Sequence, residues 1–261
     1  MQKISEAIIL AGGLGTRLRS AVADLPKCMA PVDGIPFITF VIAYLQQQGI
    51  TKFIFSLGYK SEVVTAYLQQ QYRGLEQSYV IEEEPLGTGG AIKLACESTT
   101  TPHVLVVNGD TLFDVDITTF ADFHFKHTAN CSIALKHMQD FSRYGSIEIE
   151  QNGLIKAFNE KQYCRVGYIN GGIYILEVKQ MLENNLPAKF SFETGFLERH
   201  TGTLQLFGFT QDAYFIDIGI PEDYQTLINY WKDYKQKINP KQKQGWNMFA
   251  SFINNIKEYL P

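Results

Sequence analysis

The sequence predicts an α/β protein in which helices flank a mostly parallel central sheet, with a smaller β-rich extension. Two observations support this fold class. In the first half, short apolar runs alternate with segments whose apolar residues have helical spacing. In the second half, apolar runs follow one another with little helical pattern between them. Alternating strands and helices form right-handed βαβ units, so the first half is typical of a Rossmann-like sheet.

The elements of the first half follow directly from this pattern. Strands are predicted at 7–11, 52–57, 78–81 and 103–107, where apolar runs end at glycines or polar residues. Helices are predicted at 36–48, 62–72 and 89–96, and Gly49 is the expected stop of the first helix. Each predicted strand is thus followed by a turn or a helix, as a parallel sheet requires.

The second half is expected to cover the open end of that sheet. Runs at 131–137, 146–149 and 171–176 predict strands, and residues 151–153 predict a turn. A final strand at 213–218 precedes a helix at 221–234, and residues 235–244 are polar and basic. We expect one domain over residues 1–235, followed by a linker and an amphipathic helix over 236–261. That helix would pack on the body or on another subunit in a homo-oligomer.

Composition and charge exclude several classes of protein. Of 261 residues, 45% are hydrophobic and 19% charged, and the net charge of −4 argues against a broad basic face for nucleic acid. The four cysteines lie far apart, without metal-site spacing, and are expected to be reduced thiols. The apolar run at 7–11 is too short for a signal peptide or a membrane span, so we expect a soluble cytoplasmic protein without a membrane partner.

The stretch directly after the first predicted strand points to phosphate binding. Gly12, Gly13 and Gly15 let backbone N–H groups approach phosphate oxygens, and Arg17 adds a bidentate cation. The stretch is neither a Walker A loop nor a dinucleotide fingerprint, because the required lysine and glycine spacings are missing. Taken alone, it is also compatible with a structural βα turn. Lys27 follows Pro26 and can neutralise polyphosphate charge, although a single lysine is usually a solvated surface residue.

Together, the string from Gly12 to Arg17 and the segment around Lys27 resemble the signature of the sugar-1-phosphate nucleotidyltransferases. The resemblance implies an enzyme that joins a nucleoside triphosphate to a sugar 1-phosphate and releases pyrophosphate. It gives Arg17 and Lys27 to the triphosphate. The family usually has proline after that lysine, where this chain has Cys28.

Further segments resemble this family in the same order along residues 4–230. The resemblance implies that backbone groups at Leu86 and Gly87 contact the base, with Gly89 making room nearby, and that Lys161 holds the sugar phosphate. The implied nucleotide-binding residues are Leu10, Ala11, Gly12, Gly13, Gly15, Thr16, Arg17, Glu84, Leu86, Gly87, Thr88, Gly89, Asn108 and Gly109. The implied sugar-phosphate-binding residues are Tyr144, Gly145, Glu160, Lys161, Asn170, Gly171 and Glu193. Arg143 is expected beside them, and the further acidic residue that the family often has just beyond Glu193 is missing.

Two aspartates are the expected metal ligands. Asp110 and Asp217 each come at or just after the end of an apolar strand, as does Gly12, and ligands of open α/β sheets bind at the carboxyl ends of strands. Two carboxylates facing phosphates suit Mg²⁺, which prefers oxygen ligands. The resemblance supports this assignment. The expected catalytic set is therefore Arg17, Lys27, Asp110 and Lys161, with Mg²⁺ as cofactor.

The turn at 84–91, with residues 34–37 and 48–50, is similar to the guanylyltransferase version of the family. The greatest likeness is to enzymes for D-glycero-α-D-manno-heptose 1-phosphate, which implies GTP as donor and GDP-heptose for bacterial surface glycans as product. Mannose 1-phosphate guanylyltransferases come next, and enzymes that use UTP or dTTP stay open. A few contacts decide between such sugars.

Three other functions remain to be weighed. A non-catalytic, sugar-nucleotide-binding regulator would be expected to lack the aspartates or lysines that this chain has. A glycosyltransferase could share the segment Asn108–Asp110, but its donor has no γ-phosphate for the glycine loop. A cytidylyl- or molybdopterin-nucleotide transferase shares the loop, whereas the turn at 84–91 and the segment at Asn170 favour a sugar partner.

Overall fold

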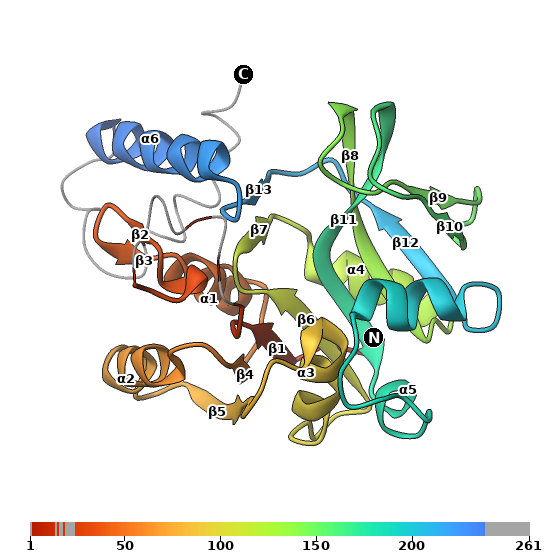
Figure 1. Ribbon diagram of the computed structural model, residues 1–261, viewed down its shortest axis with the longest axis horizontal. Coiled ribbons are helices and arrows are strands. Elements are labelled where there is room, and N and C mark those ends of the chain that lie inside the picture. Colours follow the sequence, from red (N-terminus) through yellow and green to blue (C-terminus); the bar gives the residue numbers. More distant parts are fainter. Residues whose placement is uncertain (1, 14, 16–17, 19–23, 238–261) are drawn as a thin grey trace.

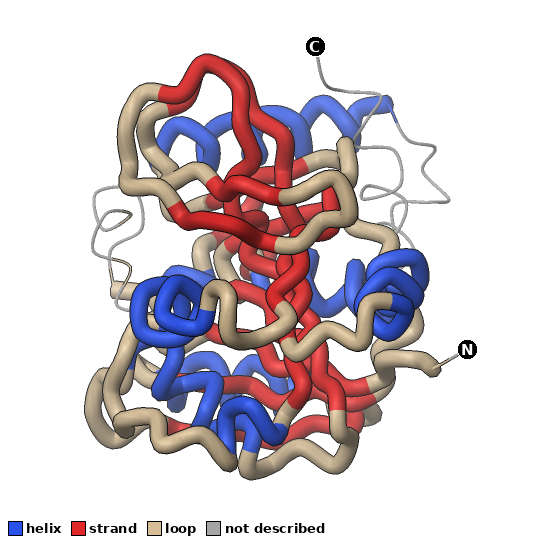
Figure 2. Tube along the Cα trace, turned by 90° about the vertical axis from the view of Figure 1, so that its right-hand side faces the viewer, coloured by secondary structure: helices blue, strands red, loops and turns tan. Residues whose placement is uncertain are grey.

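The computed structural model describes residues 2–13, 15, 18 and 24–237, which form one continuous α/β body (Figure 1). Strands run through its middle, with helices on both sides (Figure 2). No helix in these described ranges is long and apolar enough to cross a membrane. The predicted helix at 246–260 lies outside the described residues.

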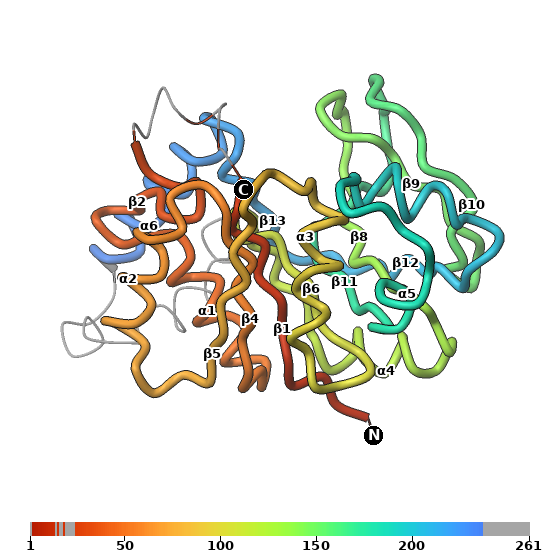
Figure 3. The backbone as a smooth tube through the Cα atoms, turned by 60° about the horizontal axis from the view of Figure 1, so that its bottom comes forward, coloured from red at the N-terminus to blue at the C-terminus, as the bar shows by residue number. Residues whose placement is uncertain are grey.

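Four parallel strands form the first half of the main sheet, in the spatial order β5-β4-β1-β6 (Figure 3). They are β1 (Glu6–Leu10), β4 (Lys52–Leu57), β5 (Glu76–Ile81) and β6 (His103–Asn108). A helix lies between each two consecutive strands of this set along the chain: α1 (Ile38–Gln47), α2 (Ser61–Gln71) and α3 (Gly87–Cys96). The sheet is covered on both faces, which is why β1, β4 and β6 are continuous apolar runs rather than alternating ones. The strands and helices predicted for this half are confirmed.

The chain order reverses on either side of β1, because β4 pairs with one edge of it and β6 with the other. Such a switch point leaves a crevice at the carboxyl ends of the central strands, where open α/β sheets bind ligands.

The β-rich half continues the same sheet beyond β6. Strand β11 (Cys164–Glu177) pairs antiparallel with β6 and with β8 (Cys131–Phe141), and β12 (Leu206–Thr210) runs parallel to β8. Strands β9 (Ile147–Ile149) and β10 (Ile155–Phe158) form a hairpin at its edge. The predicted extension is confirmed as part of one nine-stranded sheet.

Two short pairs of strands lie outside the main sheet. Strand β13 (Phe215–Asp217) pairs antiparallel with β7 (Thr111–Phe113), beside it in Figure 1, and β2 (Pro31–Val32) pairs with β3 (Ile35–Pro36). The strand predicted at 213–218 is therefore β13, and its partner is the segment that directly follows the end of β6.

The sequence analysis missed helix α4 (Ile117–Lys126), which covers part of β8 and β12. Its N-cap is Asp116, whose carboxylate accepts a hydrogen bond from the Thr119 N–H. Shorter elements are the 3₁₀ turn η1 (Lys27–Met29), α5 (Lys179–Leu182) and the π-helical turn η2 (Glu193–Glu198).

The last described helix, α6 (Pro221–Lys237), extends beyond its predicted end at residue 234. It is anchored by Trp231, which is fully buried with its ring edge-on to Phe40 of α1 at 5.1 Å. An aromatic pair of this kind stabilises by about 1 kcal/mol beyond the area it buries. The four cysteines are free, as expected.

Candidate active site

A cavity of about 520 Å³ opens at the carboxyl ends of the four parallel strands. Its wall consists of the segments that follow β1, β4, β5 and β6, together with the start of α3 and part of η1. The predicted residues that line it are Leu10, Ala11, Gly12, Gly13, Lys27, Glu84, Gly87, Thr88, Asn108, Gly109 and Asp110. The sequence thus pointed to most of this wall.

The glycine loop lets three backbone segments meet at the floor of the cavity. A Cβ at Gly12 would lie 2.7 Å from Glu82 Oε1 and 3.1 Å from the Gly58 nitrogen. The Gly109 N–H donates to the Leu10 carbonyl at 2.8 Å, so the ends of β1 and β6 stay joined there. Glycine is required at position 12 for packing, because a Cβ there would press against the Glu82 carboxylate and the Gly58 backbone.

Gly15 adopts φ +58° and faces Lys27, whose Cβ would lie 3.1 Å from a Cβ at position 15. A left-handed residue at the loop end suits glycine. Thr16 and Arg17 lie outside the described residues, so their proposed contacts with the triphosphate stay predictions.

Lys27, Asp110 and Asp217 come together at one side of the cavity. The Lys27 ammonium forms an ion pair with Asp110 Oδ2 and lies 3.6 Å from Asp217 Oδ1. The pairing of β7 with β13 explains how residues so far apart in sequence meet, because Thr111, next to Asp110, stands opposite Asp217 in the ladder. The Gly219 N–H donates to Asp217 Oδ1 at 2.7 Å and fixes that carboxylate.

The donor set at this place fits a hard divalent cation. Asp110 and Asp217 offer carboxylate oxygens, and the described part of the chain contains no group of three or more histidine, cysteine or acidic side chains that could hold a metal by itself. Burial raises the pKa of the neighbouring Cys28 thiol to about 12, with the Asp110 charge adding to the effect, so no thiolate competes. Two carboxylates plus substrate oxygens are the usual surroundings of protein-bound Mg²⁺.

A half-buried carboxylate that the sequence analysis missed lies between the glycine loop and α3. Glu82 lines the cavity, and its Oε2 accepts a hydrogen bond from the Leu86 N–H at 2.9 Å. Burial raises its pKa, and the Leu86 hydrogen bond opposes that rise. Glu84, which the sequence predicted instead, lines the cavity but is exposed. Three consecutive glutamates look alike in sequence, and only the position relative to β5 distinguishes them.

Leu86 and Gly89 serve packing in this structure. The Leu86 N–H is used by Glu82, and its carbonyl accepts from the Phe190 N–H at 2.9 Å. Gly89 makes room for the Phe190 ring, because a Cβ there would overlap the ring carbons. Within the predicted base-binding turn, Gly87 (φ +73°) and Thr88 are the residues that line the cavity.

The predicted sugar-contacting residues Asn170 and Glu193 contact each other, but neither lines the cavity. Asn170 Nδ2 donates to Glu193 Oε1 at 2.9 Å and to the Tyr174 hydroxyl at 2.8 Å. The bulge that follows Asn170 reaches the cavity wall: Gly171 lies against the Phe113 ring, and a Cβ at Gly172 would lie 2.7 Å from Asn108 Nδ2.

The start of α3 fixes the Glu193 segment as well. The Thr88 hydroxyl accepts a hydrogen bond from the Phe192 N–H at 2.9 Å. Thr88 lines the cavity, so one side chain connects the predicted nucleotide and sugar segments.

The other predicted sugar residues lie further out. The Tyr144 ring packs edge-on against Phe215 of β13 at 6.2 Å, and Arg143 pairs with Asp223 of α6 at 3.8 Å. A Cβ at Gly145 would lie 2.5 Å from the Asn159 carbonyl oxygen, next to Glu160. Glu160 and Lys161 are exposed on the loop between β10 and β11, outside the cavity wall.

Comparison with known proteins identifies the family. The family model named Nucleotidyl transferase matches residues 6–233. The chain belongs to the nucleotidyl transferase family. The family predicted from the motifs is thereby confirmed.

Relatives within this family are similar over most of their length. The chain is 49% identical to D-glycero-α-D-manno-heptose 1-phosphate guanylyltransferase of Aneurinibacillus thermoaerophilus, over 84% of this chain and 95% of the relative. It is 44% identical to the protein of the same name in Campylobacter jejuni, over 86% and 99%. The crystal structure of HddC from Yersinia pseudotuberculosis is 38% identical, with a TM-score of 0.79 over 87% of this chain and 99% of that one. The same protein is known in complex with GMP-PN.

Proposed function

We propose that this protein transfers GMP from GTP to D-glycero-α-D-manno-heptose 1-phosphate, releasing pyrophosphate and forming GDP-heptose for surface glycans. The observation that carries the reaction type is the meeting of Lys27, Asp110 and Asp217 beside the glycine-loop cavity. The heptose assignment rests on the two relatives of that name at 49% and 44% identity. We assign catalysis to the domain of residues 1–235 and place the reaction in the cytoplasm.

The reaction is an in-line displacement at the α-phosphorus of GTP. An oxygen of the sugar phosphate forms the new bond to that phosphorus, the bond to the β-phosphate bridging oxygen breaks, and its electron pair leaves with pyrophosphate. A phosphate monoester loses its second proton at about pH 6, so the nucleophile is already ionised near neutral pH and needs no general base.

What the protein must supply is therefore position and positive charge. Lys27 carries its ammonium at the side of the cavity, and Arg17 would add a second cation for the leaving pyrophosphate. Asp110 and Asp217 would hold Mg²⁺, which supplies further positive charge to the phosphate oxygens. Lys161 would bind the sugar phosphate, and its exposed loop position leaves its long side chain free to turn toward a bound substrate.

Glu82 supports guanine as the base. A carboxylate only accepts hydrogen bonds, and guanine offers the adjacent donors N1–H and N2–H₂ on one edge. Uracil and thymine present a single N–H between two carbonyl oxygens, which a carboxylate repels. Adenine and cytosine offer one amino group beside an acceptor nitrogen. The half-buried Glu82, held by the Leu86 N–H between the glycine loop and α3, therefore favours GTP.

The test is pyrophosphate release with Mg²⁺, for each of GTP, UTP, dTTP, CTP and ATP against heptose, mannose and glucose 1-phosphates. Turnover with GTP and the manno-heptose phosphate alone is expected. Turnover with mannose 1-phosphate, or with UTP or dTTP, would keep the reaction and overturn the specificity. Nucleotide binding without pyrophosphate release would point instead to a regulatory, non-catalytic protein.

A further inference from the structure

The Lys27 ammonium occupies a place between two carboxylates that come from separate segments. It contacts Asp110 Oδ2, which follows β6, and lies 3.6 Å from Asp217 Oδ1, at the end of β13. The three side chains are only 14%, 29% and 18% exposed, so water screens their charges incompletely.

We propose that Lys27 competes with a divalent cation for Asp110 and Asp217, and so sets how tightly the protein binds metal before nucleotide arrives. This inference rests on the proposed function, because it concerns the same two carboxylates. It assigns to Lys27 a positioning role that is separate from contact with phosphate.

The competition follows from charge and space. An ammonium in contact with a carboxylate oxygen takes up one of its lone pairs and part of the space beside it that Mg²⁺ or Mn²⁺ would need. A cation that displaced the ammonium would also repel it at close range. Polyphosphate oxygens would offer Lys27 another partner, so nucleotide and metal are expected to favour each other's binding reciprocally.

Gly219 makes the lysine's position available. A Cβ at this residue would overlap the Lys27 ammonium and would lie 2.8 Å from Asp217 Oδ1. The backbone at Gly219 does not have a positive φ, so alanine is compatible with its conformation. An alanine would push aside the flexible end of Lys27 and keep its charge in the protein. Gly219→Ala therefore weakens the competitor without removing it, and it also requires a small shift of the Asp217 carboxylate.

The experiment measures Mn²⁺ binding to the full-length protein without nucleotide, from the electron paramagnetic resonance signal of free Mn²⁺. We expect Lys27→Met to bind Mn²⁺ at least tenfold more tightly than the wild type, and Gly219→Ala to bind it more tightly by a smaller factor. Lys27→Arg, which keeps the charge, should stay close to wild type. Lys136→Met removes an equal charge that pairs with Asp212 on the β8 side, and should leave the affinity unchanged. Adding Asp110→Asn to Lys27→Met should abolish the gain.

The inference would be overturned if neither Lys27→Met nor Gly219→Ala bound Mn²⁺ more tightly than the wild type. If Lys27→Met fails to fold, Lys27→Gln, which also removes the charge, takes its place in the test. An equal gain in Lys136→Met would also overturn it, because net charge would then explain the effect. Pyrophosphate release is measured on the same wild-type preparation. Release without the expected gain removes this inference alone, whereas no release with any substrate pair removes the proposed function.

Discussion

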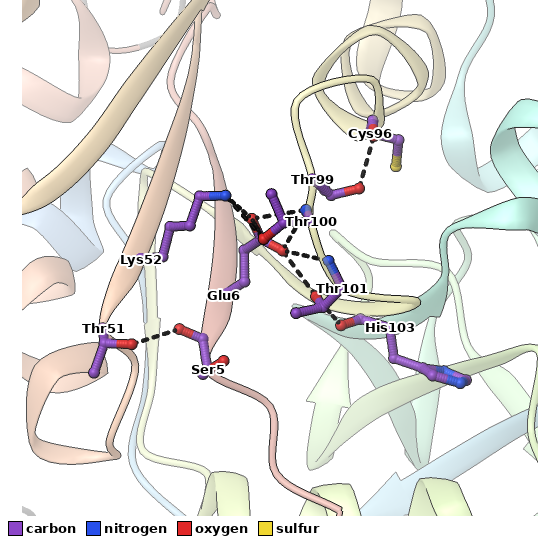
Figure 4. Close-up of polar contacts among 9 residues, drawn as sticks. All are labelled: Ser5, Glu6, Thr51, Lys52, Cys96, Thr99, Thr100, Thr101 and His103. Carbon is purple, nitrogen blue, oxygen red and sulfur yellow. Dashed lines mark hydrogen bonds and ion pairs between the residues drawn. The ribbon is translucent and has the colours of Figure 1, made fainter.

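Two lysine–carboxylate clusters lie at opposite ends of the same parallel strands. At the amino end, Glu6 of β1 is 1% exposed and pairs with Lys52 of β4 at 2.7 Å. Its oxygens also accept from the N–H groups of Thr100 and Thr101 and from the Thr101 hydroxyl, at 2.8 to 3.2 Å (Figure 4). At the carboxyl end, Lys27 is shared between Asp110 and Asp217 at the side of a cavity.

The difference is in what surrounds each cluster, because the Glu6 carboxylate is enclosed by hydrogen-bond donors whereas Lys27 and Asp110 border a cavity. Burial alone would raise the Glu6 pKa, but hydrogen bonds from Lys52, Thr101 and Thr100 outweigh it and hold that pKa below its usual value. Both carboxylate oxygens of Glu6 already accept hydrogen bonds within the protein. This cluster therefore only holds β1, β4 and the segment before β6 together. Among the described residues, Lys27 lies between two carboxylates and borders the cavity together with Asp110, so a ligand in the cavity can reach this cluster. The same residue types therefore join strands at one end and, in the proposed function, bind a ligand at the other.

Loss of the closed cluster should have the largest effect. Glu6→Ala leaves Lys52 and two backbone N–H groups without their partner, which should lower the free energy of unfolding by about 4 kcal/mol. Urea unfolding measures this, and kcat of the protein that stays folded should remain near wild type. Glu76→Ala is the matched control, because Glu76 is also the first residue of a parallel strand but is exposed. It should change stability by less than about 0.5 kcal/mol. Equal losses in both variants would mean that the Glu6 network adds nothing specific.

The open cluster should give the opposite result. Asp110→Asn keeps the shape of the side chain and removes a charge from the proposed metal site, so pyrophosphate release should fall by about a hundredfold or more. Stability should change by less than about 1 kcal/mol, because the carboxylate is partly exposed. Asp212→Asn, an exposed partner of Lys136, should leave both quantities unchanged. Near-normal turnover of Asp110→Asn would remove this aspartate from the reaction.

How far the sequence predicts each cluster follows from the same contrast. The glycine loop, Lys27 and Asp110 could be predicted because they lie in segments that resemble the family's motifs and because their residue types suit phosphate or metal. Glu6 gave no such signal: a charged residue at the start of an apolar run looks like a solvated strand end. Its burial depends on Thr100 and Thr101, which approach it from a different βα unit. The residues around Glu6 in the sequence give no sign of that contact.

Helix α4 and the β7–β13 pair illustrate two further limits. Helix α4 could have been predicted from the sequence. Asp116 is a capping residue, and Ile117, Phe120 and Ala121 follow it at helical spacing. The pairing of Thr111 with Asp217 could not be predicted, because both strands are three residues long and far apart in sequence. Likewise, nothing local in the sequence separates Glu82 from Glu84 or indicates that Phe190 fills the space at Gly89.

As the pH falls, the protein should lose stability through protonation of a buried histidine near the amino end of the sheet before it loses stability through protonation of carboxylates. His124 is fully buried, donating to or accepting from His103 at 3.0 Å and Ser132 at 2.8 Å. Burial lowers its pKa to about 3, and the nearby His103 adds to the shift. The fold thus favours the neutral ring, so this stability is complete above the unfolded pKa of about 6.5 and is lost as pH falls below it. The loss should be up to about 1.4 kcal/mol per pH unit, or about 2 kcal/mol by pH 5.

Urea unfolding between pH 7 and pH 5 measures this slope, above the ordinary pKa values of aspartate and glutamate. His103 also has a lowered pKa because of burial, so the comparison with a variant is needed. His124→Phe should be less stable at pH 7 and should lose less stability between pH 7 and pH 5 than the wild type. Parallel profiles would show that His124 does not titrate against the fold.

The smallest expected effect is on the choice of base. Glu82→Gln keeps an oxygen for the Leu86 N–H and so should keep the fold, but it replaces a pure acceptor by a group that also donates. The ratio of kcat/KM for GTP over UTP should fall about tenfold, within the range for loss of one bidentate base contact. Glu84→Gln removes the same charge two residues away, at an exposed position of the same cavity wall, and should leave the ratio unchanged. If both variants lowered it equally, the effect would be one of charge in the cavity. If only Glu84→Gln lowered it, base recognition would belong to Glu84, the residue to which the sequence pointed, and the half-buried Glu82 would be, like Glu6, a carboxylate that only holds the backbone in place.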